Sequence, residues 1–323
     1  MGVFVFLPLV LPLTAWPIAR LAERQLHPRA ATWLLTSVGA VLALCSTLCL
    51  LLLMVVGTAQ LPGNPLPDAW ADPEVRAVLP YDEMVGRAAI PLLGAVAGAC
   101  AHLVWVHRRV RTRASRALAG VPAAEGGPTV LPDDARAYAY ALPGGRGAAG
   151  TRGRIVVSRA MLTCLDAGEQ RALIAHEEAH LTARHHRFLL AAGLAARANP
   201  FLRPLRTAVA YTAERWADED AARTVGDRRT VARAIAKAAL ASGPTATGRG
   251  AATALAGFAT AGPVPRRVAA LLGPVPPAPA LPPAWTAAGL ALWTAAGGTA
   301  ASALASANAT VTLFTVLRAA TAL

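Results

Sequence analysis

Long uncharged hydrophobic runs alternate with charged and Pro/Gly-rich stretches along the chain, and this pattern predicts its main elements. An apolar run of about 20 residues is long enough to cross the hydrocarbon core of a bilayer as a helix. The pattern therefore predicts four transmembrane helices, at about residues 2–19, 30–57, 88–106 and 284–307. A chain of this kind is mainly α-helical and integral to a membrane.

The stretch between the third and fourth runs has the composition of a soluble domain. Residues 135–142 and 154–158 favour short strands, and Asp166-x-x-Glu169 is a capping box that predicts the start of a helix. We therefore expect a small α+β domain between the third and fourth transmembrane helices. The predicted division is a membrane region at residues 1–117, this domain at residues 118–274, and a Pro-rich linker with the fourth transmembrane helix at residues 275–323.

The distribution of charge predicts the orientation of the chain. Lys and Arg number 31 against 18 Asp and Glu, a net charge of +13. Basic residues follow the first and third runs, most densely at residues 107–116, whereas acidic residues follow the second run. Because cytoplasmic segments are enriched in Lys and Arg, the α+β domain is expected in the cytoplasm. The basic residues flank bilayer-spanning runs and interleave with few aromatic residues, so no nucleic-acid partner is expected.

One short motif carries the candidate chemistry. His176-Glu177-x-x-His180 lies in a run of good helix formers without Gly or Pro. On a helix, two His residues four positions apart project from one face and can bind one metal ion. Glu177 lies about 100° round the helix from His176, where its carboxylate can act as a base on a water molecule instead of binding the metal. The chain has no Cys-x-x-Cys pair, so a cysteine-based zinc site is not indicated.

A catalytic zinc site needs a third protein ligand, and two residues compete for this place. His186 follows His176 by ten positions, but Ala183 and Arg184 stand where a glycine would let the chain turn back. Glu214 is the alternative, on a separate predicted helix, with Asp218 one turn later to orient a ligand histidine. Glu178 is expected to be solvated or salt-bridged, and His185 and His186 are expected to be surface residues or to cap the end of the helix.

The order of these motifs resembles a known group of enzymes. A short strand at residues 154–158, the capped helix with His176-Glu-x-x-His180, Asn199-Pro200 and Glu214-x-x-Ala-Asp218 are similar to the integral-membrane gluzincins. These are the BlaR1/MecR1-like peptidases (family M56) and the related HtpX/Ste24-like group (family M48). The resemblance covers roughly residues 136–225.

The resemblance implies a zincin-like (gluzincin) metallopeptidase domain. One Zn²⁺ per chain would be bound by His176, His180 and Glu214, with Glu177 as the general base and Asp218 orienting a ligand. It also implies a bacterial plasma membrane location. The chain has no sensor domain after its last span, so β-lactam sensing is not expected.

The predicted function is hydrolysis of peptide bonds in a protein substrate by a zinc-dependent endopeptidase in the lipid bilayer. The substrate would be a cytosolic repressor of the BlaI type in a regulatory pathway. One alternative is a quality-control protease of the HtpX kind that degrades damaged membrane proteins. Another is a non-catalytic scaffold or receptor that keeps the zinc fold, which Glu177 argues against because a structural site needs no base.

Overall fold

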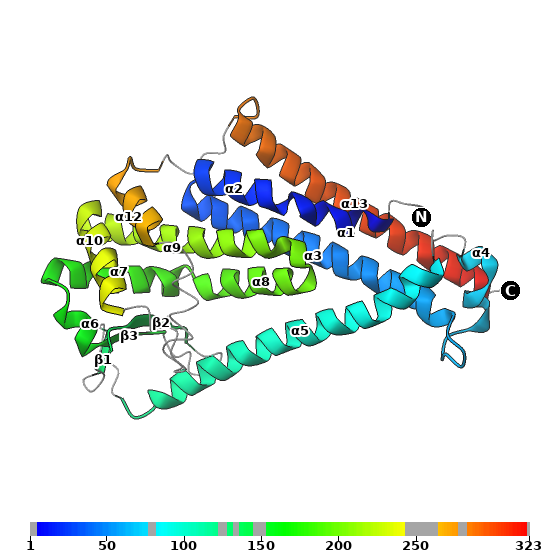
Figure 1. The fold of residues 1–323 in the computed structure, drawn as a ribbon, viewed down its shortest axis with the longest axis horizontal. Coiled ribbons are helices and arrows are strands. Elements are labelled where there is room, and N and C mark those ends of the chain that lie inside the picture. The colour runs from blue at the N-terminus through cyan, green and yellow to red at the C-terminus, as the bar shows by residue number, and fades with distance from the viewer. Residues whose placement is uncertain are drawn as a thin grey trace.

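A computed structural model describes residues 5–76, 82–121, 128–131, 136–144, 153–242, 264–276 and 283–321 of the chain. Long helices extend to one end of the molecule, and a small sheet lies at the other (Figure 1). Three helices among the described residues are long and apolar enough to cross a membrane; two contain the second and third predicted runs, and the last covers most of the fourth. They are α3 (Pro28–Ala59), α5 (Asp82–Ala117) and α13 (Ala287–Thr321).

Two of these helices are longer than predicted. The helix α5 continues through the basic run to Ala117, because arginine is a good helix former. The helix α13 continues to Thr321, although the chain was expected to leave the bilayer near Asn308. No Gly or Pro follows Gly298 in that helix, so nothing in its sequence ends it earlier. Residues 277–282 of the predicted linker lie outside the described residues.

The first predicted span is not one uninterrupted α-helix. Its described part forms three short segments, α1 (Leu7–Val10), η2 (Leu11–Thr14) and α2 (Ala15–Gln25). Pro8 and Pro12 each stand near the start of a segment, where the missing N–H costs nothing. The three segments follow one another without a gap and with right-handed helical backbone at each junction, so a first spanning helix at residues 2–19 stays a prediction.

The segment with acidic residues after α3 contains two short helices, η3 (Asp68–Ala71) and α4 (Pro73–Arg76), and residues 77–81 lie outside the described residues. Beyond it, α3 and α5 make a very close contact at two glycines. A Cβ built on Gly57 would clash with the backbone of Gly86, and one built on Gly86 would lie 2.7 Å from the Gly57 Cα. From this contact α5 diverges from α3 towards the sheet (Figure 1).

The sheet has three described strands in the order β1-β3-β2. The predicted strand at residues 154–158 is β3 (Arg154–Ser158), and the other predicted strand is shorter than expected, β2 (Ala139–Leu142). The strand β1 (Thr129–Leu131) was not predicted; it pairs parallel to β3, whereas β2 pairs antiparallel to it. The strand β2 is therefore an edge strand of the described sheet.

The helices after the sheet are α6 (Arg159–Thr163), α7 (Ala167–Thr182), α8 (His185–Ala198), η4 (Pro200–Leu202), α9 (Arg203–Val225), α10 (Arg228–Ser242) and α12 (Val264–Leu272). The largest buried hydrophobic cluster joins α2 and α3 to α8 and α9, through residues such as Leu35, Leu42, Phe188 and Leu205. Burial of such side chains stabilises the fold by about 1.5–3 kcal/mol each. The helix α9, which carries Glu214, therefore shares one core with α2 and α3.

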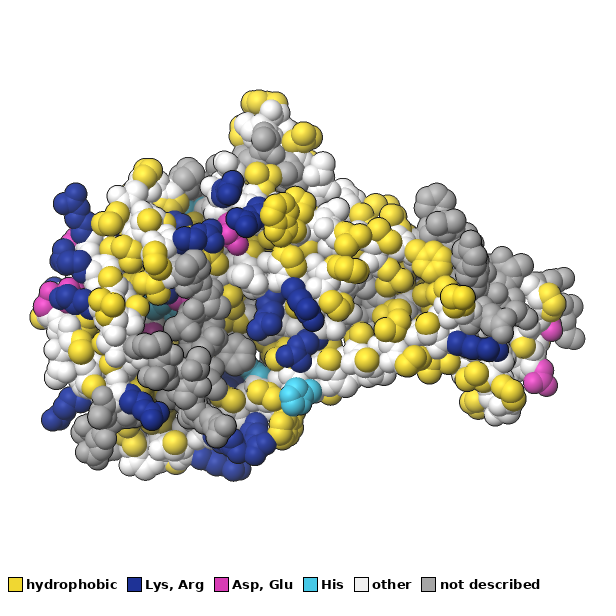
Figure 2. Space-filling model, viewed as in Figure 1, with side chains coloured by type: hydrophobic (Ala, Val, Ile, Leu, Met, Phe, Trp, Pro, Cys, Tyr) yellow, Lys and Arg dark blue, Asp and Glu magenta, His cyan; other side chains and the backbone are white. Residues whose placement is uncertain are grey.

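Charged side chains are unevenly spread over the face shown in Figure 2. Lys and Arg gather over the end that carries the sheet, and charges are sparse over the middle of the long helices, where hydrophobic side chains are exposed. Exposed large hydrophobic residues include Leu44, Leu92, Leu304 and Phe314. Exposure of this kind along a spanning helix is expected where lipid, not water, surrounds it.

Candidate metal centre

The helix α7 begins as the sequence predicts. The Asp166 side chain accepts a hydrogen bond from the Glu169 N–H at 2.9 Å, and the Glu169 carboxylate accepts one from the Asp166 N–H at 3.0 Å. Glu169 is fully buried and also binds Lys237 of α10 at 2.7 Å. The start of α7 is thereby fixed to the neighbouring helix, which sets the position of the motif two turns later.

The structure brings together the three predicted metal ligands. The Nε2 atoms of His176 and His180 lie 3.1 Å apart. The carboxylate of Glu214, on α9, lies 3.6 Å from the first of these atoms and 3.4 Å from the second. All three side chains are buried and could hold a metal ion. Two histidines and one glutamate with a fourth position left for water are a donor set that suits catalytic zinc.

Each histidine is held through its other ring nitrogen. The Nδ1 atom of His176 lies 3.1 Å from Asp218 Oδ1, in the place that the sequence predicts for Asp218. The Nδ1 atom of His180 lies 2.8 Å from Nδ1 of His185. Contacts of this kind fix the ring orientation, so that both Nε2 atoms point at the same space.

The prediction that His185 caps the end of a helix on the surface is wrong. His185 is only 1% exposed and lies against Trp216 as well as His180. The reason is a break between the two helices at Arg184, whose φ of 56° is left-handed, so that α8 begins directly after α7 with His185 against His180. The sequence gives little signal for this turn, because non-glycine residues rarely adopt a left-handed conformation.

His186 is not among the potential metal ligands found in the described residues. Its side chain is half-buried and faces a small cavity of about 60 Å³ that reaches Glu177 and His180. The cavity is enclosed by α5, β2, α7 and α8, and it has room for a few water molecules.

Arg267 of α12 is a site residue that the sequence analysis missed. Its guanidinium is buried, donates to Asp218 Oδ2 and Oδ1 at 2.8 and 2.6 Å, and lies 2.8 Å from Glu214 Oε2. The arginine thus binds both carboxylates that α9 places beside the histidines. Two adjacent arginines in an amphipathic helix are usually solvated, so nothing local marks Arg267 as buried.

The pKa values of these buried groups are shifted in different directions by their neighbours. Burial alone would raise the pKa values of Asp218 and Glu214, but the Arg267 guanidinium holds both below their usual range. Burial alone would lower the pKa of His176, but Asp218 and Glu214 raise it to about 10. Metal bound at Nε2 replaces such a proton, so metal binding is expected to release protons.

Glu177 is the exception among the buried carboxylates. Burial raises its pKa to about 7, and Oε2 has no hydrogen-bond partner among the described residues. A buried carboxyl oxygen with no partner fits a group that awaits a water molecule or substrate beside the metal. A pKa near neutrality is also what a general base requires.

Comparison with known proteins agrees with this geometry. Residues 102–197 match the family model of Peptidase family M48. The match contains His176, Glu177 and His180 and ends before Glu214. It supports a metallopeptidase of family M48, while the finer resemblance to family M56 stays a prediction. No curated protein and no solved structure matches the chain.

Proposed function

We propose that this chain is a membrane-embedded, zinc-dependent endopeptidase. The observation that carries the proposal is the convergence of His176, His180 and Glu214 beside Glu177, whose Oε2 has no hydrogen-bond partner among the described residues. A structural metal site normally fills its four positions with protein ligands and needs no base. The family M48 match over the motif supports the same reaction class.

The side chains divide the reaction among them. Bound Zn²⁺ would polarise the scissile carbonyl and make a water molecule more acidic. Glu177 would accept the proton of that water and then give it to the leaving amine. Asp218 and His185 hold the ligand histidines, and Arg267 holds the carboxylates of Glu214 and Asp218.

The strand β2 supports a peptide substrate in extended form. It is an edge strand of the described sheet, and Tyr140 and Ala141 line the cavity that reaches Glu177. The backbone of Ala141 hydrogen-bonds to the Glu177 carboxylate, so strand and base lie next to each other. An extended peptide can add to a free strand edge through main-chain hydrogen bonds, which would present its carbonyl to the site.

The test is the pair Glu177→Gln and Glu178→Gln in detergent-purified protein with fluorescent casein as the substrate. Loss of the base should lower hydrolysis at least a hundredfold, with zinc content unchanged, because general-base catalysis contributes about 10²–10⁴. Glu178 is exposed, so its variant should behave as the wild type. Zinc-dependent hydrolysis of equal rate in both variants would refute the mechanism, and zinc retained without any hydrolysis in the wild type would favour the scaffold.

The domain that carries the site is proposed to lie in the cytoplasm of a bacterium. The basic run at residues 107–116 forms the end of α5 that meets the sheet, which agrees with the positive-inside rule.

A protein substrate is proposed, and no nucleic acid. Two roles are proposed, degradation of damaged membrane proteins and cleavage of a BlaI-like repressor. Stabilisation of many membrane proteins in a deletion strain would support the first, and accumulation of one cytosolic protein the second.

A further inference from the structure

A second and larger cavity lies away from the metal centre, between the N-terminal helices and α13. Its volume is about 750 Å³, within the range of about 300–1,000 Å³ typical of small-molecule sites. It is lined mainly by apolar side chains, with two arginines at one end: Leu11, Thr14, Trp16, Pro17, Ile18, Arg20, Leu21, Arg24, Leu42, Thr294, Ala295, Gly298 and Thr299. Nothing in the proposed peptidase reaction uses this cavity.

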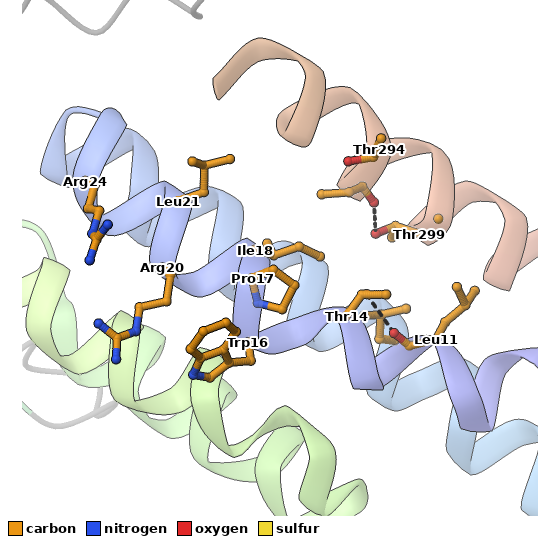
Figure 3. A pocket seen from close by; sticks show the side chains of 13 residues that line it. Leu11, Thr14, Trp16, Pro17, Ile18, Arg20, Leu21, Arg24, Thr294 and Thr299 are labelled. Atoms are coloured by element: carbon orange, nitrogen blue, oxygen red, sulfur yellow. Dashed lines mark hydrogen bonds between the residues drawn. The ribbon is translucent and has the colours of Figure 1, made fainter. Parts of the chain in front are cut away.

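The two arginines come from one face of α2. Arg20 and Arg24 are four residues apart, and Trp16 lies one turn before them, with the Arg20 guanidinium 5.4 Å from its ring centre. Figure 3 shows these side chains on α2, with Thr294 and Thr299 on α13 across the cavity. Both arginines are exposed, and neither forms an ion pair with a carboxylate of the described residues.

No lining residue carries a negative charge, so the cavity presents two uncompensated positive charges beside an apolar space. Glu23, the acidic residue of α2, is paired instead with Arg266 of α12 at 2.9 Å. An occupant that complements this arrangement has an anionic head and a hydrocarbon tail. A soluble anion would leave the apolar part of the lining without a partner.

The dimensions of the cavity fit one leaflet of a bilayer. Arg24 lies near the end of α2 that turns into α3, whereas Leu11 lies about 20 Å farther along the helical segments, at about 1.5 Å per residue. Half the hydrocarbon core of a bilayer is about 15 Å thick. The arginines are therefore at headgroup level when Leu11 and Leu42 are at acyl-chain level, and Trp16 and arginine are residues typical of such an interface.

We propose that the cavity between α2 and α13 binds one anionic phospholipid, with its phosphate at Arg20 and Arg24 and an acyl chain along Leu11 and Leu42. The site lies in the leaflet that faces the sheet end of the molecule (Figure 1). Anionic lipids of the cytoplasmic leaflet attract basic residues at that level. This inference depends on the membrane location and not on the peptidase activity.

The test uses detergent-purified protein, titrated with phosphatidylglycerol or with phosphatidylcholine of the same acyl chains and analysed by native mass spectrometry. One phosphatidylglycerol should be retained in preference to phosphatidylcholine. The double variant Arg20→Gln/Arg24→Gln should reduce that preference by up to about thirtyfold, the ratio that two basic residues near anionic lipid provide. The matched control is Arg203→Gln/Arg206→Gln, which removes the same charge from exposed residues outside the cavity lining.

A second variant tests the apolar part of the cavity. A Cβ on Gly298 would meet only Leu11 Cδ2, at 3.9 Å, so Gly298→Leu can fold while its side chain fills the space. It should abolish retention of either lipid, whereas zinc content and thermal unfolding should stay as in the wild type. Any of three results would overturn the proposal. They are equal retention of the two lipids, an unchanged lipid preference in the double arginine variant, and occupation of the cavity by a hydrophobic transmembrane peptide in place of lipid.

Discussion

Replacing His185 by Phe tests how the metal ligands are held. The ring of His185 packs against Trp216, with ring centres 4.6 Å apart, so a phenyl ring, although somewhat larger, keeps the aromatic contact. The change removes Nδ1, which lies 2.8 Å from His180 Nδ1, and Nε2, which has no hydrogen-bond partner among the described residues. We expect weaker zinc binding and little change in the stability of the metal-free protein.

The expected size follows from the proton positions. If His180 binds zinc through Nε2, its proton must be on Nδ1 and must be donated to His185 Nδ1. Burial lowers the pKa of His185 to about 3, so this ring is neutral and can accept. Without the acceptor, a buried N–H loses its partner at a cost of about 1–3 kcal/mol. Metal-free His180 can avoid this cost by moving its proton to Nε2, so the loss falls on the zinc-bound form.

The assay is competition for zinc with a fluorescent chelator. The dissociation constant should rise about 10–100-fold in His185→Phe, the range found when a partner of a ligand histidine is removed. His186→Phe is the control, because His186 is the neighbouring ring but is not part of the ligand cluster. Zinc affinity within twofold of the wild type in His185→Phe, or an equal loss in both variants, would refute the reasoning.

Three further predictions follow from buried or exposed groups. Arg267→Met should lower the free energy of unfolding by about 3–5 kcal/mol in a denaturant titration, because it leaves two buried carboxylates without their cation. Arg266→Gln removes an exposed arginine and should lower the free energy of unfolding by under about 1 kcal/mol in the same titration. Gly57→Ala should lower the thermal unfolding temperature by several degrees, because its Cβ would clash with the backbone of the crossing helix, while Gly94→Ala, which meets open space, should not. Cys164 is exposed on the domain of the metal centre, so a membrane-impermeant maleimide should label it in lysed cells and not in intact cells; labelling in intact cells would place the domain outside.

Much of the candidate site was predictable because its signals are local. The helix that carries His176 and His180 starts at a capping box four residues long, and the metal spacing depends only on helix geometry. Glu214 and Asp218 likewise share one face of a single helix. The sequence could therefore predict the pair of histidines and the pair of carboxylates separately, and the fold brings the two pairs together.

The parts that were missed depend on contacts between distant segments. Arg267 binds Asp218 from 49 positions farther along the chain, and its neighbours in sequence resemble those of any solvated arginine. His185 reaches the site because Arg184 adopts a left-handed conformation that its residue type disfavours. Hydropathy alone predicts one helix for the N-terminal run, whereas its described part forms three consecutive helical segments, with Pro8 and Pro12 near the start of two of them.

The contact between Gly57 and Gly86 fixes α5 near its start, and Ala99 and Cys100 farther along α5 contact α8. One end of the helix is fixed by two backbones in van der Waals contact, and the other end, with His107 and Arg111, forms a wall of the cavity at Glu177. The arm between Gly86 and Arg111 is about 37 Å long, so a rotation of about 5° at the glycines that parts α5 from α8 would move that wall by about 3 Å. A change of this size would widen a cavity of about 60 Å³ that is too small for a peptide. Spin labels at Arg108 and Arg187 would report it as a longer distance when a peptide binds, and a constant distance would show that the arm is rigid.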